Sequence, residues 1–217
     1  MSTGRRCSHF PGPGIYTAAC AWVDDDNDGF LDLFIVRNTQ HNSLISNLLY
    51  HNNGNTNGWL KVKLIGAASN RSAIGAKVRV RATIGGKTFW QLREITTGGG
   101  WDVVPLVAHF GLGNATNVDV VRIEWPSGTV QELHDQAPKQ ILTVTEPPRL
   151  TAAWTNGLPQ VSIHGGRGFS YDVQASGDFT NWSSVGAVTI TNFNGWAQIV
   201  DTNASAASKR FYRAATR

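Results

Sequence analysis

Short runs of alternating apolar and polar residues recur along most of this chain, and they constrain its fold more than any other feature. The runs at residues 59–64 and 76–80 are the clearest examples. Alternation of this kind is typical of half-buried strands, and a spacing of about ten residues with Gly or Asn turns is typical of sandwiches and barrels. No segment sustains the i, i+3, i+4, i+7 pattern of a helix. The sequence therefore predicts an all-β fold.

The composition agrees with a folded, β-rich chain. Hydrophobic residues make up 41% of the sequence and charged residues 16%, which favours a packed core over disorder. The formal net charge is +4, but the cations alternate with apolar residues, as at Lys61, Lys63 and Lys77, and do not cluster. We therefore expect them on solvated strand faces and expect no nucleic-acid partner. No run approaches the ~20 apolar residues of a membrane span, so none is expected.

Residues 24–32, the acidic loop, carry the sharpest chemistry in the sequence. Three aspartates fall at positions 1, 3 and 5, Gly29 at position 6 and a further aspartate at position 9. A loop coiled around a hard cation turns alternate side chains inward, and glycine at position 6 permits the sharp turn. The predicted ligands are the carboxylates of Asp24, Asp26, Asp28 and Asp32 and the backbone carbonyl of Phe30.

The loop is not an EF-hand, because position 12 is Ile35 within a strand-like run where that motif has glutamate between two helices. The same ligand spacing with β-strands on both sides is the arrangement we expect. An all-oxygen ligand set favours Ca²⁺ over zinc or copper, and Mg²⁺ tolerates irregular cages poorly. The predicted ion is therefore Ca²⁺.

The acidic loop is followed by Leu33-Phe34 and then by the string Asn47-Leu48-Leu49-Tyr50-His51-Asn52-Asn53-Gly54. This succession resembles an FG-GAP/VCBS repeat, the calcium-binding blade unit of integrin-like β-propellers. The resemblance places the family's calcium ligands at the four aspartates named above. A propeller needs several blades and one repeat is visible, so either further repeats lie outside this chain or this repeat packs onto the next domain.

The segment that follows is similar to the ASPIC/UnbV domain. The matching strings lie at residues 59–64, 69–71, 74–78, 109–113, 121–128 and 142–144. Proteins with this pairing, including cartilage-acidic-protein-like proteins, are typically extracellular, so the resemblance implies a secreted or cell-surface protein. The family implies no catalytic residues.

The tail resembles a small C-terminal β-sandwich that is appended to secreted bacterial proteins. Residues 169–176 and 210–213 carry this likeness, which implies a fibronectin- or immunoglobulin-like fold. Paired prolines at 147–148 mark a stiff linker. The expected organisation is a loop start at 1–16, a single calcium-loop repeat at 17–58, an ASPIC/UnbV-like β-domain at 59–146, a linker at 147–149 and a sandwich at 150–217.

Other residues were weighed as chemical sites. His109 has no identifiable catalytic partner, so we expect a structural strand histidine. Ser127 reads as part of a β-turn, since no nucleophile elbow surrounds it. Trp90, Trp101 and Trp196 could stack on sugar rings if exposed, but we expect them in the core. Cys7 and Cys20 could form one disulfide or none.

Taken together, these features predict a calcium-binding extracellular recognition or adhesion module, with the ion in a structural role, and not an enzyme. The expected partner is an extracellular protein or a glycan. The alternative is an accessory domain of a secreted enzyme or of a biosynthetic-cluster protein, with carbohydrate as one substrate class of that enzyme. The polar first 13 residues do not read as a signal peptide, so we expect an exported chain to be a piece of a longer precursor.

Overall fold

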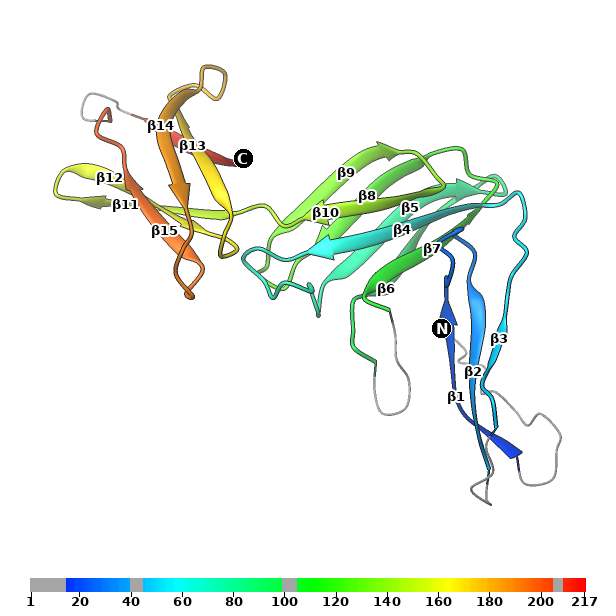
Figure 1. The fold of residues 1–217 in the computed structure, drawn as a ribbon. Helices are drawn as coiled ribbons and strands as arrows, with labels where there is room; N and C mark the ends of the chain where they lie inside the picture. Colours follow the sequence, from blue (N-terminus) through cyan, green and yellow to red (C-terminus); the bar gives the residue numbers. More distant parts are fainter. Residues whose placement is uncertain (1–14, 40–44, 99–104, 205–208) are drawn as a thin grey trace. The chain divides into compact units, whose positions relative to one another are not determined.

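The structure is a computed structural model that describes residues 15–39, 45–98, 105–204 and 209–217. Within these residues it holds sixteen β-strands and no helix (Figure 1). The predicted all-β fold is confirmed. It follows from the period-two pattern: along β12 (Leu158–His164), for example, buried and half-buried residues alternate without exception.

The acidic loop joins two strands of a three-stranded antiparallel sheet. Its strands, in the order β1-β2-β3, are β1 (Ile15–Val23), β2 (Asp32–Thr39) and β3 (Leu48–Tyr50). Val23 pairs with Asp32, so the two ends of the loop are held side by side. Because Tyr50 pairs with Leu33, the residue after β3 also arrives beside Asp32.

The segment between residues 58 and 145 forms two sheets. One has the order β10-β4-β7, with strands β4 (Gly58–Ile65), β7 (Val107–Gly113) and β10 (Gln140–Thr145). The other has the order β6-β5-β8-β9, with strands β5 (Lys77–Ile84), β6 (Lys87–Glu94), β8 (Val118–Glu124) and β9 (Val130–Gln136). Alternate residues of β4, β5, β7 and β8 are fully buried and make the core.

Two compact units divide the chain. The first comprises residues 1–63, 78–121 and 133–142, and the second comprises 64–77, 122–132 and 143–217. The division runs through β4, β5, β8, β9 and β10.

The C-terminal part of the second unit consists of two three-stranded antiparallel sheets. One has the order β11-β12-β15 and includes β11 (Arg149–Thr155) and β15 (Trp196–Val200). The other has the order β14-β13-β16, with β13 (Ser170–Ser176), β14 (Ser183–Thr189) and β16 (Phe211–Thr216). Both sheets contribute to one buried cluster, which consists of Val161, Ile163, Tyr171, Val173 and Ile190.

The acidic loop packs directly against strands β4 and β7 of the same unit. Gly29 has φ +92°, and a Cβ added there would lie 1.7 Å from Cε2 of Trp59 on β4. The Gly29 carbonyl is 2.8 Å from Nε2 of His109 on β7. Glycine is therefore needed here for two reasons, a left-handed backbone and the close approach of an indole ring.

A buried carboxylate ties β15 to β16 in the C-terminal sheets. Asp201 accepts hydrogen bonds from Arg210 Nε at 2.7 Å, from Tyr212 Oη at 3.1 Å and from the backbone N–H of Asn203 at 3.1 Å. Burial pushes the pKa of Asp201 upward, but these donors outweigh burial and lower it. Burial, and then the hydrogen bond to Asp201, raise the pKa of Tyr212 to about 12.

We predict that Gly29→Ala destabilises the protein by about 2–4 kcal/mol, because it combines a left-handed backbone with overpacking against Trp59. Urea denaturation measures this loss. Gly128 is the matched control, since its φ is +85° and an added Cβ meets nothing within 4 Å. Gly128→Ala should cost only about 1–2 kcal/mol. Equal losses in the two variants would show that contact with Trp59 is unimportant.

We predict that Asp201→Asn lowers the free energy of unfolding at pH 7 by roughly 2–3 kcal/mol, because Arg210 loses its counter-ion. The lowered pKa of Asp201 means that its contribution is present above the ordinary value of 3.8 and is lost as the pH falls through the folded-state value. The difference in free energy of unfolding between wild type and variant, measured by urea titration, should therefore become smaller below pH 3.8.

The control for Asp201→Asn is Asp172→Asn, which removes an exposed ion pair with Arg217. That change should cost about 1 kcal/mol or less at pH 7. If the difference in free energy of unfolding between wild type and Asp201→Asn stays constant down to pH 2, the role given to the ionised carboxylate is wrong.

Candidate metal centre

The side chains of the acidic loop fold back onto its own backbone. The Asp24 carboxylate accepts the N–H of Gly29 at 2.8 Å, Asp26 accepts that of Asp28 at 3.1 Å, and Asp28 accepts that of Phe30 at 2.8 Å. These bonds hold the carboxylates toward the inside of the turn. Asn27 also adopts a left-handed backbone, with φ 63°.

Three of the predicted ligands come together. One carboxylate oxygen from each of Asp24, Asp26 and Asp32 lies within 4.8 Å of the other two. Ligand oxygens lie 2.3–2.6 Å from Ca²⁺, so two oxygens on one ion are at most about 5 Å apart. The spacing therefore fits a single Ca²⁺.

Asp24 supplies the strongest sign that this group is built for a cation. Its side chain is buried, and its Oδ1 atom accepts no hydrogen bond from any residue that the structure describes. A buried carboxylate oxygen without a donor costs free energy unless a cation or another donor reaches it. The donor set at this point is oxygen only, which suits a hard cation.

Asp32 is buried where the loop returns to the sheet. Its two oxygens accept the backbone N–H groups of Asn52 at 2.8 Å and of Asp25 at 3.0 Å. These two hydrogen bonds, Asn52 first, lower the pKa of Asp32 and keep it ionised, against the opposing effect of burial. The residue is therefore held in the charged form that a metal ligand needs.

The two other predicted ligands, Asp28 and the Phe30 carbonyl, do not belong to the group formed by Asp24, Asp26 and Asp32. The Asp28 carboxylate belongs to a second, exposed group with Asp26 and His51, and not to the group around Asp24. Phe30 stacks its ring over Gly54, where an added Cβ would lie 2.8 Å from Phe30 Cε2. The carbonyl of Phe30 stays a predicted ligand.

His51 is a neighbour of the centre that sequence reasoning did not select. Its Nδ1 lies 3.1 Å from Asp32 Oδ1 and 3.9 Å from Asp26 Oδ2. The pairing of β3 with β2 would have predicted its position, because a residue just after β3 must lie close to Asp32, the first residue of β2.

Lys61 corrects an expectation. We expected it on a solvated strand face, but it is only 7% exposed, whereas Lys63 two residues along β4 is exposed. The loop covers Lys61, whose Nζ lies 2.6 Å from Asp24 Oδ2 and 3.3 Å from Asn27 Oδ1. The three clustered carboxylates and this one ammonium leave two net negative charges, which a divalent cation would neutralise.

A second buried carboxylate was also missed by sequence reasoning. Glu146 accepts the backbone N–H groups of Ala67 and Ser69, and its other oxygen accepts the hydroxyls of Ser69 and Ser127. Each oxygen thus has two donors from the chain. Ser127 serves this network, which agrees with its expected place in a turn and gives it no nucleophilic role.

The tryptophans weighed as sugar platforms differ from the expectation. Trp90 is 46% exposed on β6, an edge strand, so the prediction that it lies in the core is wrong. Trp196 is half-buried, and Trp101 lies outside the described residues. Arg81 lies over the Trp90 ring, 5.7 Å from its centroid.

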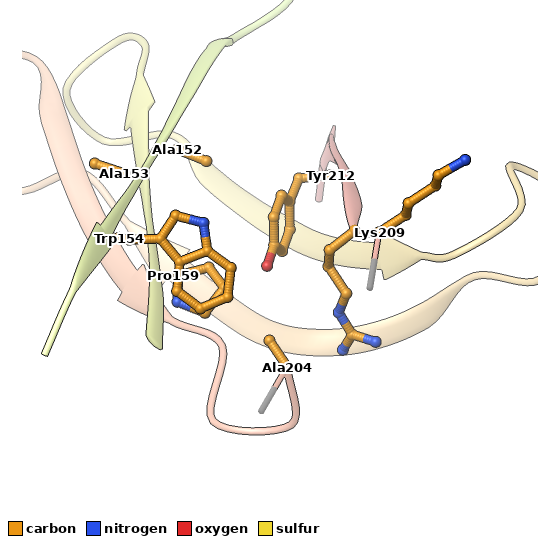
Figure 2. Close-up of a pocket in the computed structure, with 8 residues that line it drawn as sticks. Ala152, Ala153, Trp154, Pro159, Ala204, Lys209 and Tyr212 are labelled. Atoms are coloured by element: carbon orange, nitrogen blue, oxygen red, sulfur yellow. The ribbon is translucent and has the colours of Figure 1, made fainter. Parts of the chain in front are cut away.

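A shallow pocket of about 200 Å³ lies beside Asp201 in the C-terminal sheets. Figure 2 shows the rings of Trp154 and Tyr212 on its walls, with Pro159 near the indole. The Tyr212 hydroxyl is already engaged with Asp201. This pocket therefore offers ring surface and the cation of Lys209, and no free carboxylate.

Cys20 is disulfide-bonded, which answers the question the sequence left open. Its partner is not among the described residues, and Cys7 also lies outside them. Among the described residues, no helix is long and apolar enough to cross a membrane.

A comparison with known protein families finds a match for the central part of the chain. Residues 66–151 match the family model described as ASPIC and UnbV. The match overlaps most of the expected segment 59–146 and extends into β11, so this part of the resemblance is confirmed. The comparison with curated proteins and the comparison with solved structures yield no match. The part of the chain that is similar to the ASPIC and UnbV family therefore begins directly after β4 and ends within β11.

Proposed function

We propose that this chain is a calcium-binding recognition or adhesion module of an extracellular protein, with the ion in a structural role. One observation carries the proposal: Asp24 Oδ1 is buried without a donor, on a carboxylate that is grouped with Asp26 and Asp32. These three residues would hold the ion. Asp28 and the Phe30 carbonyl would complete the oxygen shell.

Bound Ca²⁺ would supply positive charge to a loop in which carboxylates crowd together. The chain's own residues do the positioning. Gly29 permits the turn, Asp32 pairs with Val23 at the end of β1 and so closes the loop, and Lys61 holds Asp24 against β4. The ion would thus secure the loop to the domain beneath it.

Calcium is favoured over other metals by the donor set. The group around Asp24 is made only of carboxylates, whereas zinc and copper prefer imidazole or thiolate. His51 offers an imidazole ligand for zinc in the neighbouring exposed group, so the effects of Zn²⁺ and Ca²⁺ must be compared directly. Mg²⁺ demands a near-ideal octahedron, which an irregular loop supplies poorly.

An extracellular setting is supported by two features. The disulfide at Cys20 persists in oxidising compartments. The ASPIC/UnbV match points to the class of extracellular proteins in which this domain occurs. The partner in this proposal is an extracellular protein or a glycan, and exposed Leu49 and Tyr50 on β3 would suit contact with a further repeat.

We predict that Ca²⁺ raises the midpoint of thermal unfolding and that the rise grows with concentration. At one hundred times the dissociation constant the stabilisation is about 2.7 kcal/mol, by mass action. Differential scanning calorimetry in Ca²⁺, in Mg²⁺ and in EDTA measures it, and Mg²⁺ should give the smaller shift. A Zn²⁺ shift larger than the Ca²⁺ shift, or no Ca²⁺ shift at all, would defeat the assignment.

We predict that Asp26→Asn weakens Ca²⁺ binding, so that the dissociation constant measured by isothermal titration calorimetry rises at least tenfold. This variant keeps an oxygen that can accept the Asp28 N–H, so the loop should still fold. Asp25→Asn is the matched control, because it removes the same charge from an exposed neighbour outside the group. Equal weakening in both variants would mean that general loop charge, not a defined site, attracts the ion.

We predict that Lys61→Met enlarges the Ca²⁺-dependent shift in the unfolding midpoint. The substitution removes a cation from beside Asp24, so the ion-free loop becomes less stable and the ion meets less repulsion. Lys63→Met, on the exposed part of the same strand, should leave the shift unchanged. A smaller shift in Lys61→Met than in wild type would contradict the shared role of Asp24.

A further inference from the structure

A cavity of about 520 Å³ lies in the first unit, walled on one side by the acidic loop. Asp24, Asn27 and Leu31 come from the loop, and the rest of the wall comes from the end of β1, from β4, β6 and β7, and from Pro105. Its volume falls within the range of small-molecule sites. Most of its lining atoms are apolar, with a few polar groups converging on it, as in such sites.

The polar groups in this cavity balance in charge. Lys61 and Asp24 pair with each other in the wall at 2.6 Å, and exposed Arg93 and Glu94 carry one charge of each sign, so the formal charges of these side chains sum to zero. The lining offers both donors and acceptors, including the amide of Asn27. A ligand with a strong net charge gains little in such a cavity. A neutral ligand with hydroxyl groups, each both donor and acceptor, can use both kinds of group.

Trp22 supplies an aromatic wall at the mouth of the cavity. It lies at the end of β1 and is 60% exposed, although large aromatic side chains are ordinarily well covered. An uncovered indole beside converging hydrogen-bonding groups suits a ligand with one apolar face and a polar rim. Sugar rings have this character, since their axial C–H groups form an apolar face and their hydroxyls lie at the edge.

We infer that this cavity binds a short stretch of a neutral saccharide, with Trp22 against a ring face and with exposed Asn27, Arg93 and Glu94 at its hydroxyls. The inference rests on the proposed calcium function, because the loop that would hold the ion also forms one wall. Fixing that wall pre-organises the cavity, so Ca²⁺ and saccharide strengthen each other's binding.

The test is a screen of the Ca²⁺-loaded chain against neutral gluco-, xylo-, manno- and galacto-oligosaccharides, with polygalacturonate as the charged comparison. Isothermal titration calorimetry then gives dissociation constants for the ligands that bind. We expect at least one neutral oligosaccharide to bind, with affinity at least about fivefold weaker in EDTA. No binding by any neutral member, or preference for polygalacturonate, overturns the inference.

Two variants in the cavity and one control outside it locate the site. Trp22→Ala should weaken saccharide binding at least tenfold, whereas Trp154→Ala should leave it unchanged, although Trp154 is 67% exposed on the pocket of Figure 2. Gly111→Leu should fill the cavity without unfolding the chain, because a Cβ at Gly111 meets nothing within 4 Å. Binding that is lost in Trp154→Ala and retained in Gly111→Leu overturns the assignment.

Failure of this inference is distinguishable from failure of the calcium proposal. A Ca²⁺-dependent rise in the unfolding midpoint without saccharide binding leaves the calcium site standing and removes the saccharide site. Saccharide binding that needs Trp22 but is equal in Ca²⁺ and EDTA removes the linkage between them, and with it the inference as stated.

Discussion

The contact between Asp24 and Lys61 is the interaction on which the first unit depends. A buried ammonium and a buried carboxylate meet at 2.6 Å where the acidic loop lies on β4. Breaking such a pair leaves an uncompensated charge in a buried site, which costs far more stability than losing a surface ion pair. The pair therefore fixes where the loop sits, and the Trp59 indole against Gly29 fixes how closely it approaches.

The same pair leaves the loop electrostatically incomplete. Lys61 engages one oxygen of Asp24, while the other is buried without a donor and two further carboxylates crowd beside it. One ammonium cannot balance three carboxylates at this separation. A divalent cation would match the remaining charge, and it would act at the point where the loop meets β4 and walls the neighbouring cavity. The position of the loop and the uncompensated charge beside it are thus consequences of one arrangement of residues.

The all-β fold and most strands could be predicted because strand periodicity is local, and the aspartate spacing was visible because a metal loop is contiguous. What covers a strand is not local. The alternation along β4 assigns Lys61 and Lys63 to the same face, but it cannot say that a loop buries one and leaves the other in water. His51 and Glu146 were missed for the same reason, since their partners are set by strand pairing and by contacts distant in the sequence.

Among the described residues, a comparison of Asp24 with the buried carboxylates of Glu146 and Asp201 shows what sets a candidate metal ligand apart. Glu146 receives two donors on each oxygen from N–H and hydroxyl groups, and Asp201 is satisfied by Arg210, Tyr212 and a backbone N–H. Both are complete within the chain, so they serve to hold elements together. The Asp24 side chain is equally buried, yet one of its oxygens has no donor, and carboxylate oxygens of Asp26 and Asp32 lie within 4.8 Å of the Asp24 carboxylate. Burial alone does not distinguish a structural carboxylate from a candidate ligand. An oxygen without a donor beside like charges favours a ligand, because a cation relieves both the missing bond and the repulsion.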